Sequence, residues 1–116
     1  LSGGMRRRVG IARANVTRPP LVFYDSPTAG LDPITATNIM SLIVKQRDLR
    51  NTTTVMTSHR LQDGVLMANY RWNDAAGRIE RVTAPEEQSD RHTRFMVMRQ
   101  GRLVFDGTEE EMEACA

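Results

Sequence analysis

Two clusters of residues near the start of the sequence carry groups suited to a phosphate and a metal ion. The chain opens with Leu1-Ser2-Gly3-Gly4, ahead of an expected helix. Backbone N–H groups that a serine and two glycines expose at a helix start can bind a phosphate. Further along, the apolar run Leu21 to Tyr24 ends in Asp25, and an aspartate at the end of a buried strand is a natural Mg²⁺ ligand. The two clusters together predict half of a nucleotide-hydrolysing site.

The other half of such a site is absent from the sequence. No G-x-x-x-x-G-K-[ST] phosphate cradle occurs among the 116 residues, so we expect that the chain does not hold ATP alone. The length suits one modest domain or a piece of one. Because the chain begins inside a motif, without an initiator Met or a signal peptide, it predicts a truncated product or a partial gene model.

Composition narrows the class of protein. The net charge is only +2 and aromatic residues are few, so Arg6, Arg7 and Arg8 indicate a solvated helix face or a subunit contact rather than nucleic-acid binding. No apolar run approaches the ~20 residues of a membrane helix. The single cysteine, Cys115, cannot form an internal disulfide, which fits a reducing compartment.

The elements that must position these groups follow from periodicity and from proline. A helix is expected from Met5 to about Val16, with an apolar stripe of Met5, Val9, Ala12 and Val16, and Pro19-Pro20 ends it. The run from Leu21 to Tyr24 then predicts a strand buried on both faces.

A second helix and a second strand are expected next. Asp32-Pro33 supplies an N-cap and an N1 proline for a helix to about Arg47, with Ile39, Leu42 and Ile43 facing inward. Thr52 to Thr57 predicts another buried strand that ends at Ser58-His59, and Arg60 to Ala68 a short helix. Strand, helix, strand and helix in this order indicate a parallel sheet.

The residues after 68 predict antiparallel elements. A hairpin is expected from Tyr70 to Val82, turning at Asp74 to Gly77, followed by a polar surface loop from Thr83 to Thr93. Phe95 to Met98 and Leu103 to Phe105 flank the turn Gln100-Gly101 as a second hairpin. Thr108 with Glu111 predicts a capping box that opens a terminal helix.

Each candidate site residue also has a structural interpretation. Ser2, Gly3 and Gly4 suit a simple helix cap, Asp32 suits the N-cap before Pro33, and His59 suits a histidine with a structural partner. Asp25 suits a turn cap, although a lone carboxylate after four apolar residues is costly to bury unless it is paired or metal-bound.

Taken together, these segments resemble the C-terminal part of an ABC-type ATPase domain. The motifs are Leu1-Ser2-Gly3-Gly4 as the signature, Leu21-Val22-Phe23-Tyr24-Asp25 as the Walker B strand followed by Ser26-Pro27-Thr28, Ala29-Gly30-Leu31-Asp32 as the D-loop, and Thr57-Ser58-His59 as the switch segment. The resemblance covers residues 1–69 and resumes at 94–112. It divides residues 1–116 into 1–69 from signature to switch histidine, a polar variable segment 70–93, and a terminal hairpin and helix 94–116. It implies an α/β, partial P-loop NTPase fold with a parallel sheet core and a C-terminal β-hairpin.

The resemblance also implies roles for single residues. Ser2, Gly3 and Gly4 would face the γ-phosphate of ATP held by the opposite subunit, as a helix N-terminus with close backbone approach suits. Asp25 would hold Mg²⁺, commonly through water. Asp32 would communicate across the dimer, and His59 would sense the γ-phosphate and help organise the attacking water.

Ser26 is the main departure from the family pattern. Most active members have glutamate at this position, acting as a general base or a water positioner, and serine cannot accept a proton at neutral pH. Because phosphoryl transfer depends mainly on positioning and electrostatics, slow turnover through His59 and the metal is expected to survive. We therefore predict nucleotide-dependent closure with reduced or redirected hydrolysis.

The function implied is that of an ATPase subunit of an ABC transporter, at the cytoplasmic face of the inner membrane. Two subunits would sandwich two ATP molecules with Mg²⁺ and move a transmembrane permease. Residues 5–9 and 26–35 look most like Mce/Mla-type lipid and solvent-tolerance transporters. Two alternatives stay open: a non-hydrolytic, nucleotide-gated clamp that uses Ser26, and a DNA-repair or chromosome-organising ATPase, although no long heptad arms are visible.

Overall fold

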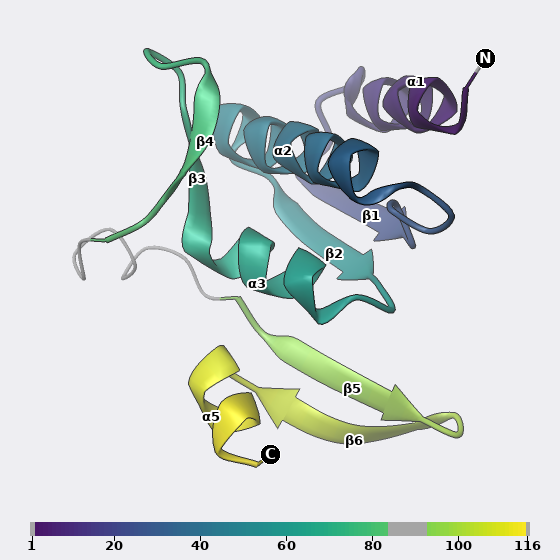
Figure 1. Cartoon of the computed structure of the whole chain (residues 1–116), viewed down its shortest axis with the longest axis vertical. Helices are drawn as coiled ribbons and strands as arrows, with labels where there is room; N and C mark the ends of the chain where they lie inside the picture. Colours follow the sequence, from purple (N-terminus) through teal and green to yellow (C-terminus); the bar gives the residue numbers. More distant parts are fainter. Residues whose placement is uncertain (1, 84–92, 116) are drawn as a thin grey trace.

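The computed structural model describes residues 2–83 and 93–115. The first half alternates helices and strands: α1 (Gly3–Asn15), β1 (Leu21–Asp25), α2 (Pro33–Arg50), β2 (Thr53–Thr57) and α3 (Leu61–Asn69). The second half holds two hairpins and a short helix: β3 (Tyr70–Asn73), β4 (Arg78–Arg81), β5 (Phe95–Arg99), β6 (Arg102–Gly107) and α5 (Glu109–Ala114) (Figure 1).

The strands form three two-stranded sheets. Strands β1 and β2 run parallel, in a register that pairs Leu21 with Thr53 and Asp25 with Thr57, and α2 makes the connection between them. This confirms the parallel pairing predicted from the strand–helix–strand order. The pairs β3–β4 and β5–β6 are antiparallel hairpins, as predicted, so the described chain is an α/β structure with small sheets.

The hydrophobic core lies on one face of the parallel pair. Val22 and Tyr24 of β1 point into a cluster completed chiefly by α2, whose fully buried core residues are Ala36, Ile39, Met40, Ile43 and Val44. Helix α1 joins this cluster through Ile11 and through Asn15, whose Nδ2 donates a 2.9 Å hydrogen bond to Tyr24 Oη. Burial raises the pKa of Tyr24, and the bond to Asn15 opposes that rise.

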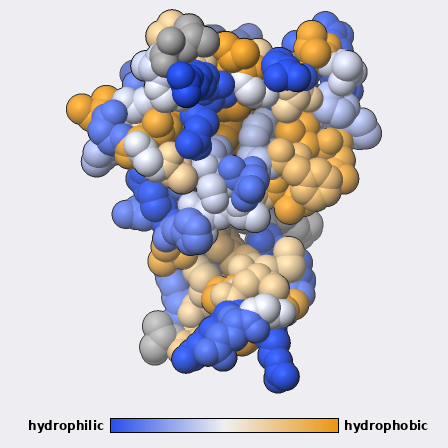
Figure 2. Space-filling view, turned by 90° about the vertical axis from the view of Figure 1, so that its right-hand side faces the viewer, coloured by the Kyte–Doolittle hydropathy of each residue, from blue (hydrophilic) through white to orange (hydrophobic). Residues whose placement is uncertain are grey.

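The prediction that the strand 21–24 is buried on both faces is wrong. Burial alternates along β1, and Phe23 is 70% exposed while Leu21 and, on β2, Val55 are 43% and 40% exposed. Among the described residues, helices cover one face of this pair, so the second set of alternating side chains is exposed. Figure 2 shows hydrophobic surface gathered over part of one side of the molecule.

The predicted apolar stripe of α1 is also wrong. Met5, Val9 and Val16 are exposed, whereas the helix buries Ile11 and Asn15 and partly buries Gly4 and Arg7. The buried face of α1 therefore combines Ile11 with polar and glycine contacts to α2 and β1, and it differs from the predicted stripe.

Local capping signals give the expected boundaries elsewhere. Helix α2 starts at Pro33 as predicted and runs three residues beyond Arg47, to Arg50, where Asn51 adopts a left-handed conformation. Thr108 and Glu111 form the predicted capping box of α5. Most of the predicted loop 83–93 lies outside the described residues. Across ranges 2–83 and 93–115, no helix is long and apolar enough to span a membrane.

Candidate functional site

The segments singled out for chemistry meet on one side of the molecule. The N-termini of α1 and α2 and the carboxyl ends of β1 and β2 all lie toward the right in Figure 1. Asp25 and Thr57 are register partners, so the residues that follow them, Ser26 and Ser58, leave the sheet side by side. Ligands of open parallel sheets bind at this edge.

Asp25 is held by the neighbouring strand rather than buried. Thr57 Oγ1 donates a 2.7 Å hydrogen bond to Asp25 Oδ1, and the residue is exposed. Within the described chain, Asp25 Oδ2 has no hydrogen-bond partner. One anchored oxygen and one open oxygen on an exposed carboxylate fit a Mg²⁺ ion bound directly or through water. Because Asp25 is exposed, the cost of burying a lone carboxylate, argued from the four preceding apolar residues, does not arise.

Ser26 has a constrained backbone. Its φ of 46° lies in the left-handed region, and its N–H donates to Thr57 Oγ1 at 2.9 Å and to the Thr57 carbonyl at 3.2 Å. Thr57 thus contacts both residues at which the family pattern places chemistry, Asp25 and Ser26.

Arg7 connects the signature helix to the loop after β1. Its Nη1 and Nη2 donate 2.8 Å hydrogen bonds to the carbonyls of Ser26 and Ala29. A planar guanidinium suits two carbonyls at once, and hydrogen bonds from a charged donor are the stronger kind. Of the two predicted roles, the solvated face is therefore wrong for Arg7, and the subunit contact stays a prediction.

The opening glycines have a packing role. A Cβ on Gly4 would lie 2.8 Å from Thr35 Cγ2, and one on Gly3 would lie 3.3 Å from Leu31 Cδ2. Ser2 is the N-cap of α1, since its Oγ accepts from the Met5 N–H at 3.2 Å. The cap interpretation of Ser2 is confirmed, and the free N–H groups of the first turn stay at an exposed helix end.

Asp32 is the N-cap of α2, as predicted. Its Oδ2 accepts from the Thr35 N–H at 3.0 Å and its Oδ1 from the Thr35 hydroxyl at 2.6 Å. The Thr35 hydroxyl, followed by the Thr35 N–H, lowers the pKa of Asp32. His59 is exposed and makes no hydrogen bond within residues 2–83 and 93–115, so its imidazole is open to a ligand.

Three contributors escaped the sequence interpretation: Arg7, Thr57 as the partner of Asp25, and Asp63. Asp63 is 2% exposed and accepts a hydrogen bond from Thr28. The sequence holds only a weak signal, the four-residue spacing of Asp63 and Met67 on one face of a short helix. The structure buries both residues.

At the strand ends, Asp25 is the carboxylate with an oxygen open to Mg²⁺. The described residues contain no group of three or more His, Cys, Asp or Glu side chains that could hold a metal ion. A magnesium ion at Asp25 would therefore take most ligands from water or from nucleotide phosphates.

Comparison with known proteins agrees with the motif order. Residues 1–29 match the sequence profile of the ABC transporter family. The phosphonates import ATP-binding protein PhnC of Thiobacillus denitrificans is 35% identical over 116 residues, which is 100% of this chain and 36% of that protein. PhnC of Bordetella parapertussis is 44% identical over 114 residues, or 98% of this chain and 35% of that protein. The intermembrane phospholipid transport system ATP-binding protein MlaF of Haemophilus influenzae is 39% identical over 72 residues, or 62% of this chain and 27% of that protein.

Residues 1–29 are therefore similar to the ABC transporter family, and the chain as a whole is similar to part of ATP-binding proteins of transport systems. The chain spans about a third of the length of the PhnC relatives it matches.

Proposed function

We propose that this chain supplies the signature, Walker B, D-loop and switch segments of an ATPase subunit that drives an ABC transporter. The observation that carries the proposal is the Thr57–Asp25 contact, which fixes a carboxylate at the sheet edge beside the helix ends of α1 and α2. The three relatives described above, which are named as ATP-binding proteins of import or transport systems, support it.

Each site residue has a separate role in this proposal. Asp25 offers its open oxygen to a Mg²⁺ ion that neutralises phosphate charge. The exposed α1 N-terminus, with Ser2, Gly3 and Gly4, offers backbone N–H groups to the γ-phosphate of a nucleotide held by a second subunit. His59 orients the attacking water and contacts the γ-phosphate. Because hydrolysis then needs a second subunit, ATP-driven dimerisation is part of the same proposal.

Ser26 determines the rate of ATP hydrolysis that we expect. With φ in the left-handed region, the Ser26 side chain leaves the backbone beside Asp25, where the family pattern has glutamate. Serine supplies no general base, so hydrolysis is slow and relies on positioning. If the subunit does not hydrolyse ATP at all, it is a nucleotide-gated clamp, and Ser26 is the observation that supports this alternative.

The transported compound and the partners form the finer part of the proposal. A transmembrane permease would receive the closure of the ATPase dimer, with the subunit peripheral at the cytoplasmic face of the inner membrane. Lipid is proposed as cargo because residues 5–9 and 26–35 resemble Mce/Mla-type ATPases and because MlaF is among the relatives. The PhnC relatives offer phosphonates as the competing cargo.

A chimera tests the ATPase proposal. Residues 1–116 would replace the aligned segment of Thiobacillus denitrificans PhnC, which is similar over the whole chain. We expect Mg²⁺-dependent ATP binding, dimerisation with ATP, and slow hydrolysis that Asp25→Asn abolishes. Asp74→Asn, in the β3–β4 turn, is the matched control and should leave the activity intact.

The possible outcomes distinguish the ATPase proposal from the clamp alternative, and a separate measurement tests the cargo. A folded chimera that binds no ATP and does not dimerise contradicts the proposal. ATP-dependent dimerisation without turnover, even after Ser26→Glu, favours the clamp. For the cargo, co-purification of the subunit with a phosphonate permease instead of a lipid-transport complex would overturn the lipid assignment.

A further inference from the structure

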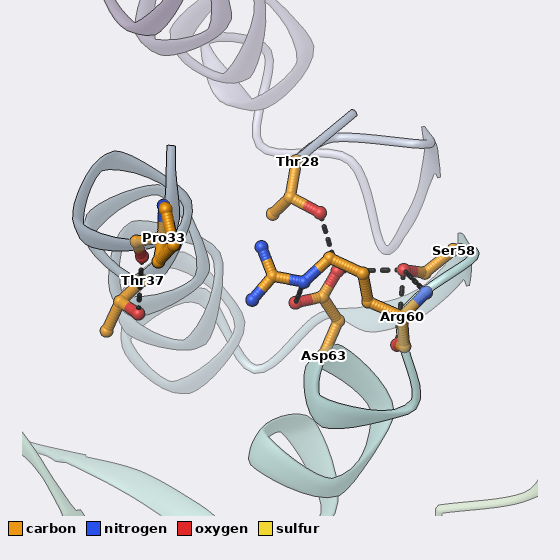
Figure 3. Close-up of polar contacts among 6 residues, drawn as sticks. All are labelled: Thr28, Pro33, Thr37, Ser58, Arg60 and Asp63. Atoms are coloured by element: carbon orange, nitrogen blue, oxygen red, sulfur yellow. Dashed lines mark hydrogen bonds and ion pairs between the residues drawn. The ribbon is translucent and has the colours of Figure 1, made fainter. Parts of the chain in front are cut away.

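A buried carboxylate lies behind the switch segment, outside the residues that face a nucleotide. Asp63, in the first turn of α3, is 2% exposed, and the Thr28 residue that contacts it is 3% exposed. Thr28 Oγ1 and Ser58 Oγ donate hydrogen bonds of 2.6 and 2.7 Å to the same oxygen, Asp63 Oδ2. Figure 3 shows these side chains converging on Asp63 from the loop after β1 and from the end of β2.

The buried carboxylate of Asp63 is surrounded by an opposite charge and by hydrogen-bond donors. Arg60 Nε lies 3.8 Å from Asp63 Oδ1, so the buried charge has an ion-pair partner as well as two hydroxyl donors. A buried carboxylate without such partners would be strongly destabilising. Because both hydroxyls end on one oxygen atom, the loop residue and the switch residue cannot separate without breaking a charge-assisted bond.

The same network shapes the turn that carries His59. Ser58 Oγ accepts a 3.0 Å hydrogen bond from the Arg60 N–H, which closes a turn with His59 at its centre. The Ser58 hydroxyl has one proton, and Asp63 Oδ2 is its nearest acceptor. Asp63 therefore orients the Ser58 oxygen so that its lone pairs face the Arg60 N–H.

We propose that Asp63 is a positioning residue that ties the loop of Ser26 to His59, through Thr28 on one side and Ser58 on the other. The role of His59 rests on the proposed function, whereas the positioning itself is a property of the chain. With the Thr57–Asp25 bond, the two strand ends are then coupled at two levels, one at the exposed edge and one behind it.

The decisive variant is Thr28→Val, which removes one hydroxyl and keeps the side-chain shape, far along the sequence from His59. Thr37→Val is the matched control, because the Thr37 hydroxyl bonds only the Pro33 carbonyl within α2 at 3.0 Å (Figure 3). In the 116-residue chain, we expect Thr28→Val to shift the NMR resonances of the His59 imidazole and the Arg60 amide. Thr28→Ser should restore them, and Thr37→Val should leave them unmoved.

The PhnC chimera adds a kinetic readout. Misplacement of a catalytic group costs rate rather than affinity, so Thr28→Val should lower kcat by ~10-fold or more with the KM for ATP nearly unchanged. Ser58→Ala, at an exposed residue and so tolerated by the fold, should lower kcat similarly. If Thr28→Val leaves the His59 and Arg60 resonances where the wild type and Thr37→Val have them, the positioning role is wrong. If the resonances move but the wild-type chimera has no ATPase activity, the proposed function fails and the positioning role stands.

Discussion

Thr57 Oγ1 lies 2.7 Å from Asp25 Oδ1 and 2.9 Å from the Ser26 nitrogen, so one hydroxyl on β2 organises two consecutive residues at the end of β1. Such a contact is possible because the parallel register places Thr57 directly opposite Asp25. The side chain that positions Asp25, the proposed Mg²⁺ ligand, therefore comes from the neighbouring strand.

Replacing Thr57 by valine tests this relationship. Valine keeps the β-branched shape and cannot donate to Asp25, so the carboxylate loses its anchor and the Mg²⁺ requirement of the PhnC chimera should rise. We expect at least a ~10-fold loss of kcat, of the size seen when active-site positioning fails, and recovery in Thr57→Ser. The matched control is Thr53→Val, on the same face of β2, where no side-chain hydrogen bond is broken. Equal activity of Thr57→Val and Thr53→Val would contradict the assigned role.

Arg7 should stabilise the fold through the loop after β1. Arg7→Met removes two hydrogen bonds from a charged donor and leaves the Ser26 and Ala29 carbonyls without that partner. The expected loss of unfolding free energy is about 1.5–3 kcal/mol, measured by urea denaturation of the 116-residue chain. Arg8→Met, on the exposed part of the same helix, should change it by less than about 0.5 kcal/mol. Arg7→Met that unfolds at the same urea concentration as Arg8→Met would show that the clamp adds nothing.

Two of the three glycines of α1, Gly4 and Gly10, should respond in opposite ways to alanine. A Cβ at Gly4 would meet Thr35 Cγ2 at 2.8 Å, whereas one at Gly10 would meet nothing within 4 Å. Gly4→Ala should therefore lower the thermal midpoint. Gly10→Ala should raise stability by roughly 0.5–1 kcal/mol, because alanine loses less backbone entropy in a helix.

Relief of the Gly4 clash provides the control. Thr35→Ser deletes Cγ2 and keeps the hydroxyl that bonds Asp32, so it should recover most of the loss caused by Gly4→Ala. Failure of Thr35→Ser to rescue Gly4→Ala would mean that the helix contact is not the cause.

The N-cap of α2 should make stability depend on pH in acid. The folded pKa of Asp32 is lowered, first by the Thr35 hydroxyl and then by the Thr35 N–H. A group with a lowered folded pKa stabilises the fold above its unfolded pKa, and that contribution is lost as the pH falls through the folded value. The urea midpoint of the wild type should thus fall more between about pH 5 and pH 2 than that of Asp32→Asn, which caps helices without titrating.

Thr35→Val separates the causes of that pH dependence. It removes the hydroxyl donor and keeps the backbone N–H, so its pH dependence should lie between those of the wild type and Asp32→Asn. Identical pH profiles for all three proteins would exclude Asp32 as the titrating group.

Short-range contacts explain which elements could be predicted from sequence. The caps at Asp32 and Thr108 bond to residues three positions away, and the β5–β6 turn depends on Gln100-Gly101, both with positive φ. The site's supporting contacts could not be predicted in this way, because Arg7 reaches residues 19 and 22 positions away and Asp63 reaches Thr28 across 35 positions. The face that α1 buries was mispredicted for the same reason, since distant polar partners and Gly4 decide it.

Ser26 gives the sharpest test of the proposal that this subunit hydrolyses ATP slowly. Ser26→Glu restores a carboxylate beside Asp25, and a side chain without β-branching can adopt the left-handed backbone there at a cost of about 1–2 kcal/mol. A positioned general base contributes ~10²–10⁴-fold, so kcat of the PhnC chimera should rise by about 10²-fold in Ser26→Glu. Ser26→Gln has the same length and backbone cost but accepts no proton, so it should stay near the wild-type rate. A wild-type chimera that hydrolyses ATP as fast as Ser26→Glu would show that Ser26 does not limit turnover and that another group acts in place of the glutamate.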